Sequence, residues 1–487
     1  MAYSDLRAWI KLVEERGELL RLFGASPDLE MSGIMEILDR QGKRPIPSLL
    51  FDDVPGYTKG YRTIYGMLAS PRRLAITLGL SENDLEKVSL VKNWRNKRKN
   101  MKLIPPQMVS SGAVQENILT GKNIDLLKLP IPRFHELDGG RYFGTASVVL
   151  TRDLDTGWIN LGTYRSMLVD GNRLAMHISP GSQGRIMMEQ YLAKKQAVPM
   201  AIAVGIDPAL WFAGFNKIPW GVSEYDFAGG IRGEPIKVVK APYTGIPVPA
   251  NAEIVVEGEI QPGEMIDEGP FGEWHGYYAN QGLEPVPEPV LRIKTMMHRN
   301  DPIFSAVHVG NLRSEYKLAV CVGQAEAIWG ALDSCAVPGV AGVWCHESGG
   351  GYLLNIVSIK TAYAGHSRQA GVIASEIVPA MGHYTIVVDE DVDPSNLDDV
   401  MWAVATRTDP QRAIDITHYC KSYNADPAIP LQLKRTTPHL YTSHAIIDAC
   451  RPYDWKHEYY PIAQMSPELH DKMLKKWRPT LEEHLSL

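Results

Sequence analysis

Apolar residues recur at helical spacing near the start of the chain. The segment "SDLRAWIKLVEERG" (4–17) predicts an amphipathic helix with Ser4 as its N-cap and Gly17 at its end. The apolar face of this helix is formed by Leu6, Trp9, Ile10 and Val13. Short strand-like runs such as "SLLFDDV" follow, so residues 1–110 are expected to mix helices with strands.

The pattern becomes rich in β-strand signals between residues 111 and 320. Four such runs are "FGTASVVLTRD", "PMAIAVGI", "AEIVVEGEI" and "PVLRIKTMMH", and their spacing favours a mostly antiparallel sheet or barrel. After residue 320, helices such as "KLAVCVGQAEAIWGALDS" alternate with strands such as "YLLNIVSIK" and "YTIVVDED". We therefore predict an α+β protein with three regions, 1–110, 111–320 and 321–487.

Charge and cysteine content narrow the possible partners. The 487 residues carry a net charge of -6, which gives no reason to expect a nucleic-acid or membrane partner. The basic run "KNWRNKRKNMK" (92–102) is better explained as a helix end or linker than as a phosphate-binding patch. No stretch has the roughly 18 apolar residues of a membrane span, and the charged start is unlike a signal peptide.

The five cysteines are scattered through the last third of the chain, and none forms a CxxC pair. An odd, scattered set predicts reduced thiols in a cytoplasmic protein rather than a disulfide frame or a zinc site. Cys345 and His346 are expected to be adjacent by chance and not to form a catalytic dyad.

Two glycine-rich or acidic segments imitate known binding loops. "DEDVDPSNLDDV" (389–400) begins like a calcium loop, but Pro394 replaces its glycine and Val400 its final glutamate. We therefore expect an acidic connection from a strand to a helix. "SGGGYLL" (348–354) lacks a Walker lysine, so a tight turn is expected there.

Several polar residues stand in unusual settings. "EGPFGEWHG" (268–276) places Glu268 and Glu273 around a Gly-Pro-Phe-Gly turn. Asn160 and Arg165 flank the strand-like "LGTY" and would face opposite sides of it unless the strand bends. Glu224 lies in the glycine-rich "PWGVSEYDFAGGIRGEP" (219–235).

These residue types suit one another chemically. Asparagine and glutamate oxygens bind hard cations such as magnesium or manganese, and an arginine fork binds carboxylate or phosphate. One acid could pair with Arg165 while the other exchanges a proton with a reacting carbon. Each residue alone could equally be a structural polar group, and composition does not assign the roles.

The motifs "EGPFGEWHGYY", "INLGTYR", "PWGVSEYDFAGGIRGEP" and "VVDEDVDPSNLDDVMWAVATR" resemble the UbiD-type decarboxylases, which use prenylated flavin mononucleotide. The resemblance runs from about residue 45 to about residue 450. It implies an N-terminal α/β region, a central split β-barrel that holds the cofactor and a C-terminal α/β oligomerisation domain. It also implies a homodimer or homohexamer, and a flavin prenyltransferase that supplies the cofactor.

The resemblance assigns catalytic roles to three positions. Arg165 matches the arginine that contacts cofactor and substrate carboxylate, and Glu268 matches the acid that hydrogen-bonds this arginine. Glu273 matches the acid that protonates the flavin-substrate adduct after carbon dioxide has left. Arg165 is expected to be an exposed site arginine with little influence on stability.

The resemblance also implies a set of cofactor contacts. Asn160, Gln183 and Glu224 would hold a divalent metal, Mn²⁺ or Mg²⁺, at the flavin phosphate, and Ser223 would lie near a K⁺ ion. Further cofactor-binding residues would be Thr163, Tyr164 and Ser182. Much of the family has histidine where Gln183 stands; the nearby His177 lies six residues earlier, on a different turn or face.

The substrate is implied only as a class: an aromatic, heteroaromatic or α,β-unsaturated carboxylic acid, with an aromatic acid favoured and either direction of reaction allowed. In "HVGNLRSEYKL" (308–318), His308, Arg313 and Lys317 could hold a second carboxylate or a phenolate, or could form surface salt bridges. The alternatives are a non-catalytic flavin-binding or accessory subunit of a decarboxylase, and an ordinary flavin oxidoreductase.

Overall fold

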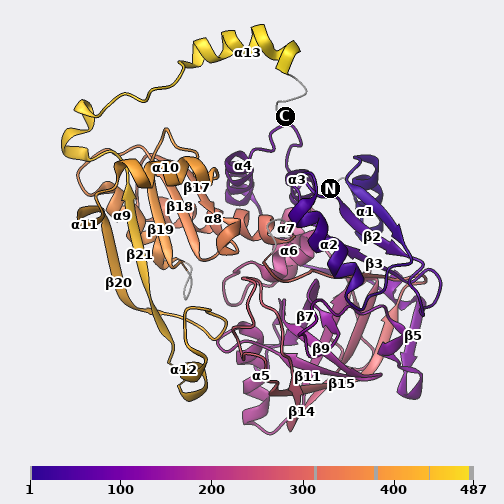
Figure 1. Ribbon diagram of the computed structural model, residues 1–487. Helices are drawn as coiled ribbons and strands as arrows, with labels where there is room; N and C mark the ends of the chain where they lie inside the picture. Colours follow the sequence, from indigo (N-terminus) through magenta and orange to yellow (C-terminus); the bar gives the residue numbers. More distant parts are fainter. Residues whose placement is uncertain (1–2, 312–314, 378–381, 438, 482–487) are drawn as a thin grey trace.

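The computed structural model describes residues 3–311, 315–377, 382–437 and 439–481, which form four β-sheets with surrounding helices (Figure 1). The N-terminal sheet has the order β1-β2-β3-β16, formed by β1 (Leu19–Phe23), β2 (Ser48–Asp52), β3 (Arg62–Tyr65) and β16 (Ile303–Ser305). The helices of this N-terminal part are α1 (Leu6–Glu15), α2 (Glu30–Gln41), α3 (Pro71–Leu78) and α4 (Lys87–Asn100). The predicted mixture of helices and strands is confirmed.

Helix α1 has the apolar face that the sequence predicts, but it begins one residue later. Its buried residues are Leu6, Trp9, Ile10 and Val13. The carboxylate of Asp5, in place of Ser4, accepts a hydrogen bond from the Ala8 N–H at 2.9 Å. Aspartate caps a helix as well as serine does, and Asp5 also pairs with Arg299 at 3.1 Å. The prediction of Ser4 as N-cap was therefore wrong.

A nine-stranded antiparallel sheet forms the middle part of the chain and curls into a half-barrel, at the lower right in Figure 1. Its order is β6-β9-β10-β15-β14-β11-β7-β8, with β5 paired to β15. The strands are β5 (Asn117–Thr120), β6 (Tyr142–Gly144), β7 (Ser147–Arg152), β8 (Ile159–Gly162), β9 (Arg165–Asp170), β10 (Arg173–His177), β11 (Val198–Val204), β14 (Ile254–Glu268) and β15 (Val286–His298). The expected antiparallel sheet and the α+β fold class are confirmed.

Smaller elements surround this half-barrel. A three-stranded sheet has the order β13-β12-β4, formed by β4 (Gln107–Met108), β12 (Lys237–Lys240) and β13 (Pro247–Pro249). The helices of this part are α5 (Gln183–Ala193), α6 (Pro208–Phe215) and α7 (Glu224–Arg232).

The C-terminal part contains a five-stranded sheet flanked by helices. The strand order is β17-β18-β19-β21-β20, formed by β17 (Val340–Cys345), β18 (Leu354–Ile359), β19 (Tyr384–Asp389), β20 (Ile414–Lys421) and β21 (Tyr441–Ala449). The helices are α8 (Lys317–Ser334), α9 (His366–Glu376), α10 (Leu397–Arg407), α11 (Pro410–Ala413), α12 (Leu431–Thr436) and α13 (Pro467–Leu481). Helix α13 stands apart from the rest (Figure 1), and the predicted helix and strands are confirmed.

Two large apolar cores hold these parts together. One core includes Trp9, Trp94, Trp211 and Trp344, so it joins the N-terminal helices to α6 and to the C-terminal sheet. The other lies between the N-terminal sheet and the half-barrel and includes Phe51, Tyr142, Phe143 and Phe304. The first core contains residues from all three predicted regions, so it does not divide the chain at 110 or 320. These two domain boundaries stay a prediction.

The basic run ends helix α4, as predicted, but it packs against protein instead of facing solvent alone. Arg98 pairs with Glu326 of α8, and Lys99 lies 3.0 Å from Asp333 on the same helix. The basic side chains at the C-terminal end of α4 are therefore neutralised by acidic side chains of α8. Among the described residues no helix meets the length and apolarity that a bilayer crossing requires.

The acidic segment after β19 is a structural ion-pair network, as the expected strand-to-helix connection allows. Asp389 is fully buried, and one of its oxygens lies 3.0 Å from both Arg407 and Arg451. Lys456 approaches the other oxygen at 3.3 Å. The glycine run also forms the expected turn, because Gly350 and Gly351 have φ angles of 66° and 79°.

Replacing Asp389 should unfold this part of the chain more easily. Asp389→Ala leaves three cations without their buried counter-charge, so we expect the free energy of unfolding in urea to fall by about 3–5 kcal/mol. The exposed Asp398 on α10 provides a matched control, and Asp398→Ala should cost less than about 1 kcal/mol. Equal losses for the two variants would contradict a stabilising role of the network.

Candidate active site

Arg165 lies at the centre of a compact ion-pair cluster. Its guanidinium donates two parallel hydrogen bonds to Glu268, from Nε to Oε1 at 2.9 Å and from Nη2 to Oε2 at 2.8 Å. Nη1 donates to Glu273 Oε1 at 2.5 Å, and Nη2 donates also to Gln281 Oε1 at 2.9 Å. The ring of Phe271 lies 5.0 Å from the guanidinium carbon. The structure thus brings together the three residues for which the resemblance implies catalytic roles.

Sheet geometry and one glycine position these groups. Arg165 begins β9 and Glu268 ends β14, after which residues 269–285 lead to β15. Gly269 has a φ of 86°, and a Cβ atom there would lie 1.8 Å from Nε2 of Gln281. That amide nitrogen donates to the carbonyl of Glu268 at 2.8 Å. The absence of a side chain at Gly269 therefore allows Gln281 to brace both members of the pair.

Burial strengthens the pair between Arg165 and Glu268. The two side chains are 8% and 0% exposed. Burial opposes the charge on Arg165, but the carboxylates of Glu268 and Glu273 outweigh it and raise the pKa of the guanidinium. Burial also works against the Glu268 anion, yet Arg165 keeps the pKa of this carboxyl below its ordinary value. The hydroxyl of Tyr142 donates to Glu268 at 3.0 Å, so the carboxylate stays ionised.

The expectation that Arg165 is exposed was wrong. The sequence indicated a functional arginine but gave no measure of its burial, because the groups that cover it come from distant segments. Tyr142, Phe271 and Gln281 belong to the site as well, and the sequence analysis did not single them out. The position of Phe271 between the two glutamates was the only available indication of its role.

Glu273 is the less constrained of the two acids. Its side chain is 12% exposed and accepts one hydrogen bond from the guanidinium, whereas Glu268 accepts two. The loop that carries it is held by the C-terminal part of the chain. His275 Nε2 donates to the Ala425 carbonyl at 2.6 Å, and Lys434 Nζ donates to the Ala279 carbonyl at 2.6 Å. Glu273 therefore lies on a loop with fixed ends and an accessible carboxylate.

A second polar cluster forms around the hydroxyl of Tyr164. This hydroxyl accepts a hydrogen bond from the Gly184 N–H at 3.1 Å, at the start of α5. The side chains of Asn160 and Ser182 are within hydrogen-bonding reach of it, and the Glu224 carboxylate lies close by. The chain bends between β8 and β9, so Asn160 and Arg165 need not lie on opposite faces of one strand. The N-termini of α5 and α7 both lie in this cluster, and such ends favour anions.

Glu224 is the charged member of this cluster. It is 4% exposed, and burial raises its pKa to about 7, although the Leu161 N–H donates to it at 2.7 Å. No described side chain forms an ion pair with it. Asn160 donates through Nδ2 to Thr151 and Gln183 through Nε2 to Ile218, which leaves both amide oxygens as possible ligands. One carboxylate and two amide oxygens fit a hard divalent cation.

The remaining predicted cofactor residues have partners within the protein. The Thr163 hydroxyl donates to the Ser147 carbonyl at 3.2 Å. Ser223 is the N-cap of α7, and its hydroxyl donates to the Ile159 carbonyl at 2.9 Å. His177 lies instead with Glu268 and Glu288, and its Nδ1 is 2.6 Å from Glu288. Gln183 and not His177 is thus the group beside Tyr164.

His308 and Lys317, in the segment predicted to face the substrate, are buried. His308 is 2% exposed; its Nδ1 donates to the Ser32 carbonyl at 3.0 Å, and its Nε2 lies 3.0 Å from Nε2 of His135. Burial, helped by His135, lowers the pKa of His308 to about 4. Lys317 is 4% exposed, and burial lowers its pKa to about 8. The surface salt bridges considered for these two residues were wrong, while Arg313 lies outside the described residues.

Three family models match the chain in order. They are described as the N-terminal domain, the Rift-related domain and the C-terminal domain of 3-octaprenyl-4-hydroxybenzoate carboxy-lyase (UbiD), and they match residues 10–89, 107–312 and 320–449. A phenolic acid decarboxylase of Streptomyces sp. (strain D7) is 30% identical over 464 residues, which cover 93% of each chain.

Solved structures share the fold over nearly the whole chain. The UbiD-class enzyme HmfF from Pelotomaculum thermopropionicum, in complex with FMN, is 27% identical with a TM-score of 0.83, covering 97% of this chain and 100% of that one. An evolved dimeric form of HmfF in complex with prFMN is 26% identical with a TM-score of 0.80, covering 97% and 99%. The open form of vanillic acid decarboxylase from Sedimentibacter hydroxybenzoicus is 27% identical with a TM-score of 0.83, covering 99% of each chain.

Removing the buried arginine should cost stability as well as function. Arg165→Ala leaves Glu268 as a buried, uncompensated anion, so we expect the free energy of unfolding in urea to fall by about 3 kcal/mol or more. Adding Glu268→Gln to this variant removes the charge and should recover part of the loss. A double variant no more stable than Arg165→Ala would contradict the assignment of the loss to the unpaired carboxylate.

Stability should also depend on pH through Glu315, which is 1% exposed and accepts from the Gly66 N–H at 3.1 Å. Burial raises its pKa from 4.5 to about 8. The stability that this carboxyl contributes is therefore full below about pH 4.5 and is lost as the pH rises through about 8. The Glu315→Gln side chain does not titrate. The thermal midpoint of this variant minus that of the wild type should therefore increase as the pH rises from 6 to 9. A constant difference would contradict this.

Proposed function

The chain belongs to the UbiD family of carboxy-lyases, and we propose that it decarboxylates an aromatic carboxylic acid with a bound prenylated flavin. The observation that carries the proposal is the single guanidinium of Arg165, which is shared between a fully buried acid and a more accessible one. Support for the substrate class comes from relatives named as phenolic acid and vanillic acid decarboxylases. Support for the cofactor comes from the HmfF complexes with FMN and with prFMN.

Arg165 would bind the substrate carboxylate. Its Nε and Nη2 groups are already committed to Glu268, whereas Nη1 donates only to Glu273. An incoming carboxylate would take over Nη1 and displace Glu273. Because Glu268 remains paired, the arginine would keep its orientation during this exchange.

Charge balance explains why Glu273 would then carry a proton. Arg165, Glu268 and Glu273 together carry one excess negative charge when both acids are ionised. A substrate carboxylate would add another, and like charges in a buried site disfavour ionisation of the acid that has lost its partner. Glu273 would therefore take up one proton from solvent as the substrate binds.

Glu273 would return this proton at the end of the reaction. The prenylated flavin would supply, when bound, an azomethine-ylide-like carbon for reversible bonding to the substrate carbon next to its carboxylate, and that bond would break again before the product leaves. After carbon dioxide has left, Glu273 would donate its proton to the same substrate carbon, so that one carboxylate and one proton yield one decarboxylated product and carbon dioxide. Proton transfer in the reverse direction would support carboxylation at high bicarbonate concentration.

Asn160, Gln183 and Glu224 would hold a divalent metal, Mn²⁺ or Mg²⁺, at the flavin phosphate. Their available oxygens, and the N-termini of α5 and α7, would together bind the metal and the phosphate anion. Tyr164, Ser182 and Thr163 would provide further cofactor contacts, and backbone groups near Ser223 would hold K⁺. A flavin prenyltransferase would supply the cofactor. The homodimer or homohexamer and the cytoplasmic location stay predictions.

Glu273→Gln tests the reaction and the role of the acid together. Because a general acid contributes about 100- to 10,000-fold, we expect carbon dioxide release from hydroxybenzoic acids to fall by that factor while bound cofactor is retained. Glu264→Gln is the matched control, because Glu264 lies on the same strand and pairs with Arg292 at 2.6 Å, away from the site. Proteins are prepared without oxygen, together with a flavin prenyltransferase, and the released cofactor is identified by mass spectrometry.

Three outcomes would contradict the proposal. Full activity of Glu273→Gln would exclude this residue as the proton donor. Prenylated flavin without carbon dioxide release from any aromatic or acrylic acid would favour a binding or accessory subunit. Unmodified flavin with nicotinamide-dependent reduction would favour an oxidoreductase.

A further inference from the structure

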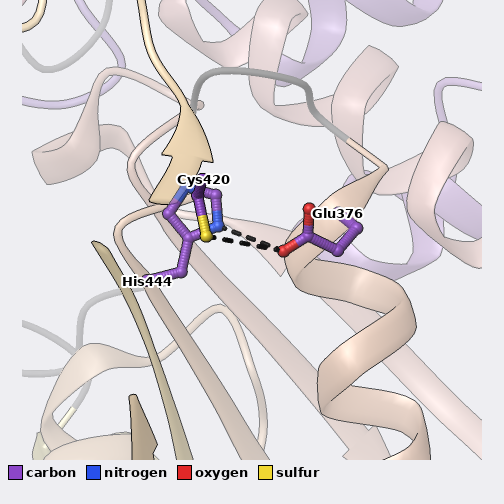
Figure 2. Close-up of side chains that lie close together, drawn as sticks. All are labelled: Glu376, Cys420 and His444. Atoms are coloured by element: carbon purple, nitrogen blue, oxygen red, sulfur yellow. Dashed lines mark hydrogen bonds and ion pairs between the residues drawn. The ribbon is translucent and has the colours of Figure 1, made fainter. Parts of the chain in front are cut away.

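Three side chains that can bind a metal meet at one end of the C-terminal sheet, far from the site described above along the chain. Glu376 is the last residue of α9, Cys420 lies on β20 and His444 lies on β21. One potential ligand atom from each residue lies within 4.8 Å of the others. Glu376 Oε1 is 4.0 Å from Cys420 Sγ and 3.4 Å from His444 Nδ1, so the carboxylate faces both (Figure 2).

The backbone departs from regular strand geometry to turn Cys420 inward. The pairing of β20 with β21 shifts between Thr417 and Cys420, and Tyr419 has a φ of 60°, which is unfavourable for a residue with a side chain. Cys420 is 6% exposed, whereas Tyr419 is 79% exposed. A left-handed residue costs about 1–3 kcal/mol, and this conformation places the thiol beside His444.

His444 supplies a second, independent indication of a ligand. Its side chain is 2% exposed, and within the described residues neither ring nitrogen makes a hydrogen bond of good geometry; Nδ1 has only the 3.4 Å contact with Glu376 Oε1. A buried imidazole without a well-formed hydrogen bond is unfavourable, and a cation bound through a ring lone pair removes that penalty.

We propose that Glu376, Cys420 and His444 bind one Zn²⁺ ion that fastens helix α9 to the edge strand β20. Thiolate, imidazole and carboxylate are the three ligand types that zinc accepts, at about 2.3, 2.0 and 2.1 Å. Ligand atoms within 4.8 Å need to approach by about 1 Å, and the Glu376 side chain, which is 55% exposed, has the freedom to do so. On binding, the Cys420 thiol releases its proton to solvent, and water completes the tetrahedron.

The scattered cysteines and the absence of a CxxC pair argued against a zinc site at the level of the sequence. The ligands here come from three separate elements, 44 and 24 positions apart, and the spacing of such a set carries no motif. The site does not depend on the flavin chemistry proposed above. It would, however, hold the strand that leads into the segment that contacts the Glu273 loop through Ala425.

Zinc content and zinc X-ray absorption of the full-length holoprotein test this proposal. We expect about one zinc ion per chain after dialysis with limiting chelator, and a sulfur scatterer at about 2.3 Å. In Cys420→Ser the sulfur scatterer should disappear. The matched control is Cys335→Ser, because Cys335 is a free and exposed thiol, and it should leave the spectrum unchanged.

If Cys420→Ser fails to fold because Cys420 is buried, a variant of the exposed Glu376 provides a second test. Replacing a residue that hydrogen-bonds to a metal ligand weakens metal binding about 10- to 100-fold. Replacing the ligand itself, in Glu376→Gln, should therefore weaken zinc binding by about 100-fold or more. Zinc without a sulfur scatterer, no stoichiometric zinc, or unchanged zinc affinity in Glu376→Gln would each overturn the proposal. Decarboxylase activity is not the readout, so failure here and failure of the proposed function are distinguishable.

Discussion

The buried guanidinium of Arg165 is the constraint that organises the site. A charge that is only 8% exposed is stable only when opposite charges and hydrogen-bond acceptors surround it. Glu268 meets this demand with two parallel hydrogen bonds, and Gln281 occupies a further donor. What remains for the proposed chemistry is the Nη1 amino group and one acid, Glu273, that can leave it. The proposed reaction would therefore use the contact of Arg165 that the fold holds least rigidly.

The curled sheet satisfies this constraint from several directions. Strand β9 begins with the arginine, β14 ends with its partner, and the connection to β15 returns with Gln281 and Glu273. The second polar cluster lies just before β9 along the chain, so the bend at Thr163 and Tyr164 links the two halves of the site. The proposed phosphate-binding end and the proposed acid-base end are in this way separated by one short turn of backbone.

Much of this arrangement could be predicted from the sequence. The helix at 317–334 and the strands of the last third were identifiable from pattern, and Arg165, Glu268 and Glu273 from resemblance, whereas Tyr142, Phe271 and Gln281 of the same cluster were not. The prediction of Ser4 as N-cap failed because the neighbouring Asp5 is an equally good N-cap and also pairs with Arg299. The burial of Arg165, His308 and Lys317 could not be predicted, because each is covered by segments far away in the sequence.

The inward turn of Cys420 was invisible for a different reason. It depends on the left-handed backbone conformation of Tyr419 and on a shift of strand register, neither of which the residue types predict. Similarly, no local pattern shows that β16 completes the N-terminal sheet, since that pairing joins residues 303–305 to residues 62–64. Features set by register and long-range pairing are those that the sequence analysis missed.

The separation of Arg165 from its partners also has a consequence for synthesis of the protein. Arg165 and Gln281 are 116 positions apart. At roughly 5–20 residues per second of translation, the arginine emerges from the ribosome on the order of ten seconds before its last partner. During that interval burial of its charge would be unfavourable, so we expect this end of the nascent half-barrel to stay open to water until β14 and β15 have been made. The Arg165 cluster would then be among the last parts of the half-barrel to exclude water.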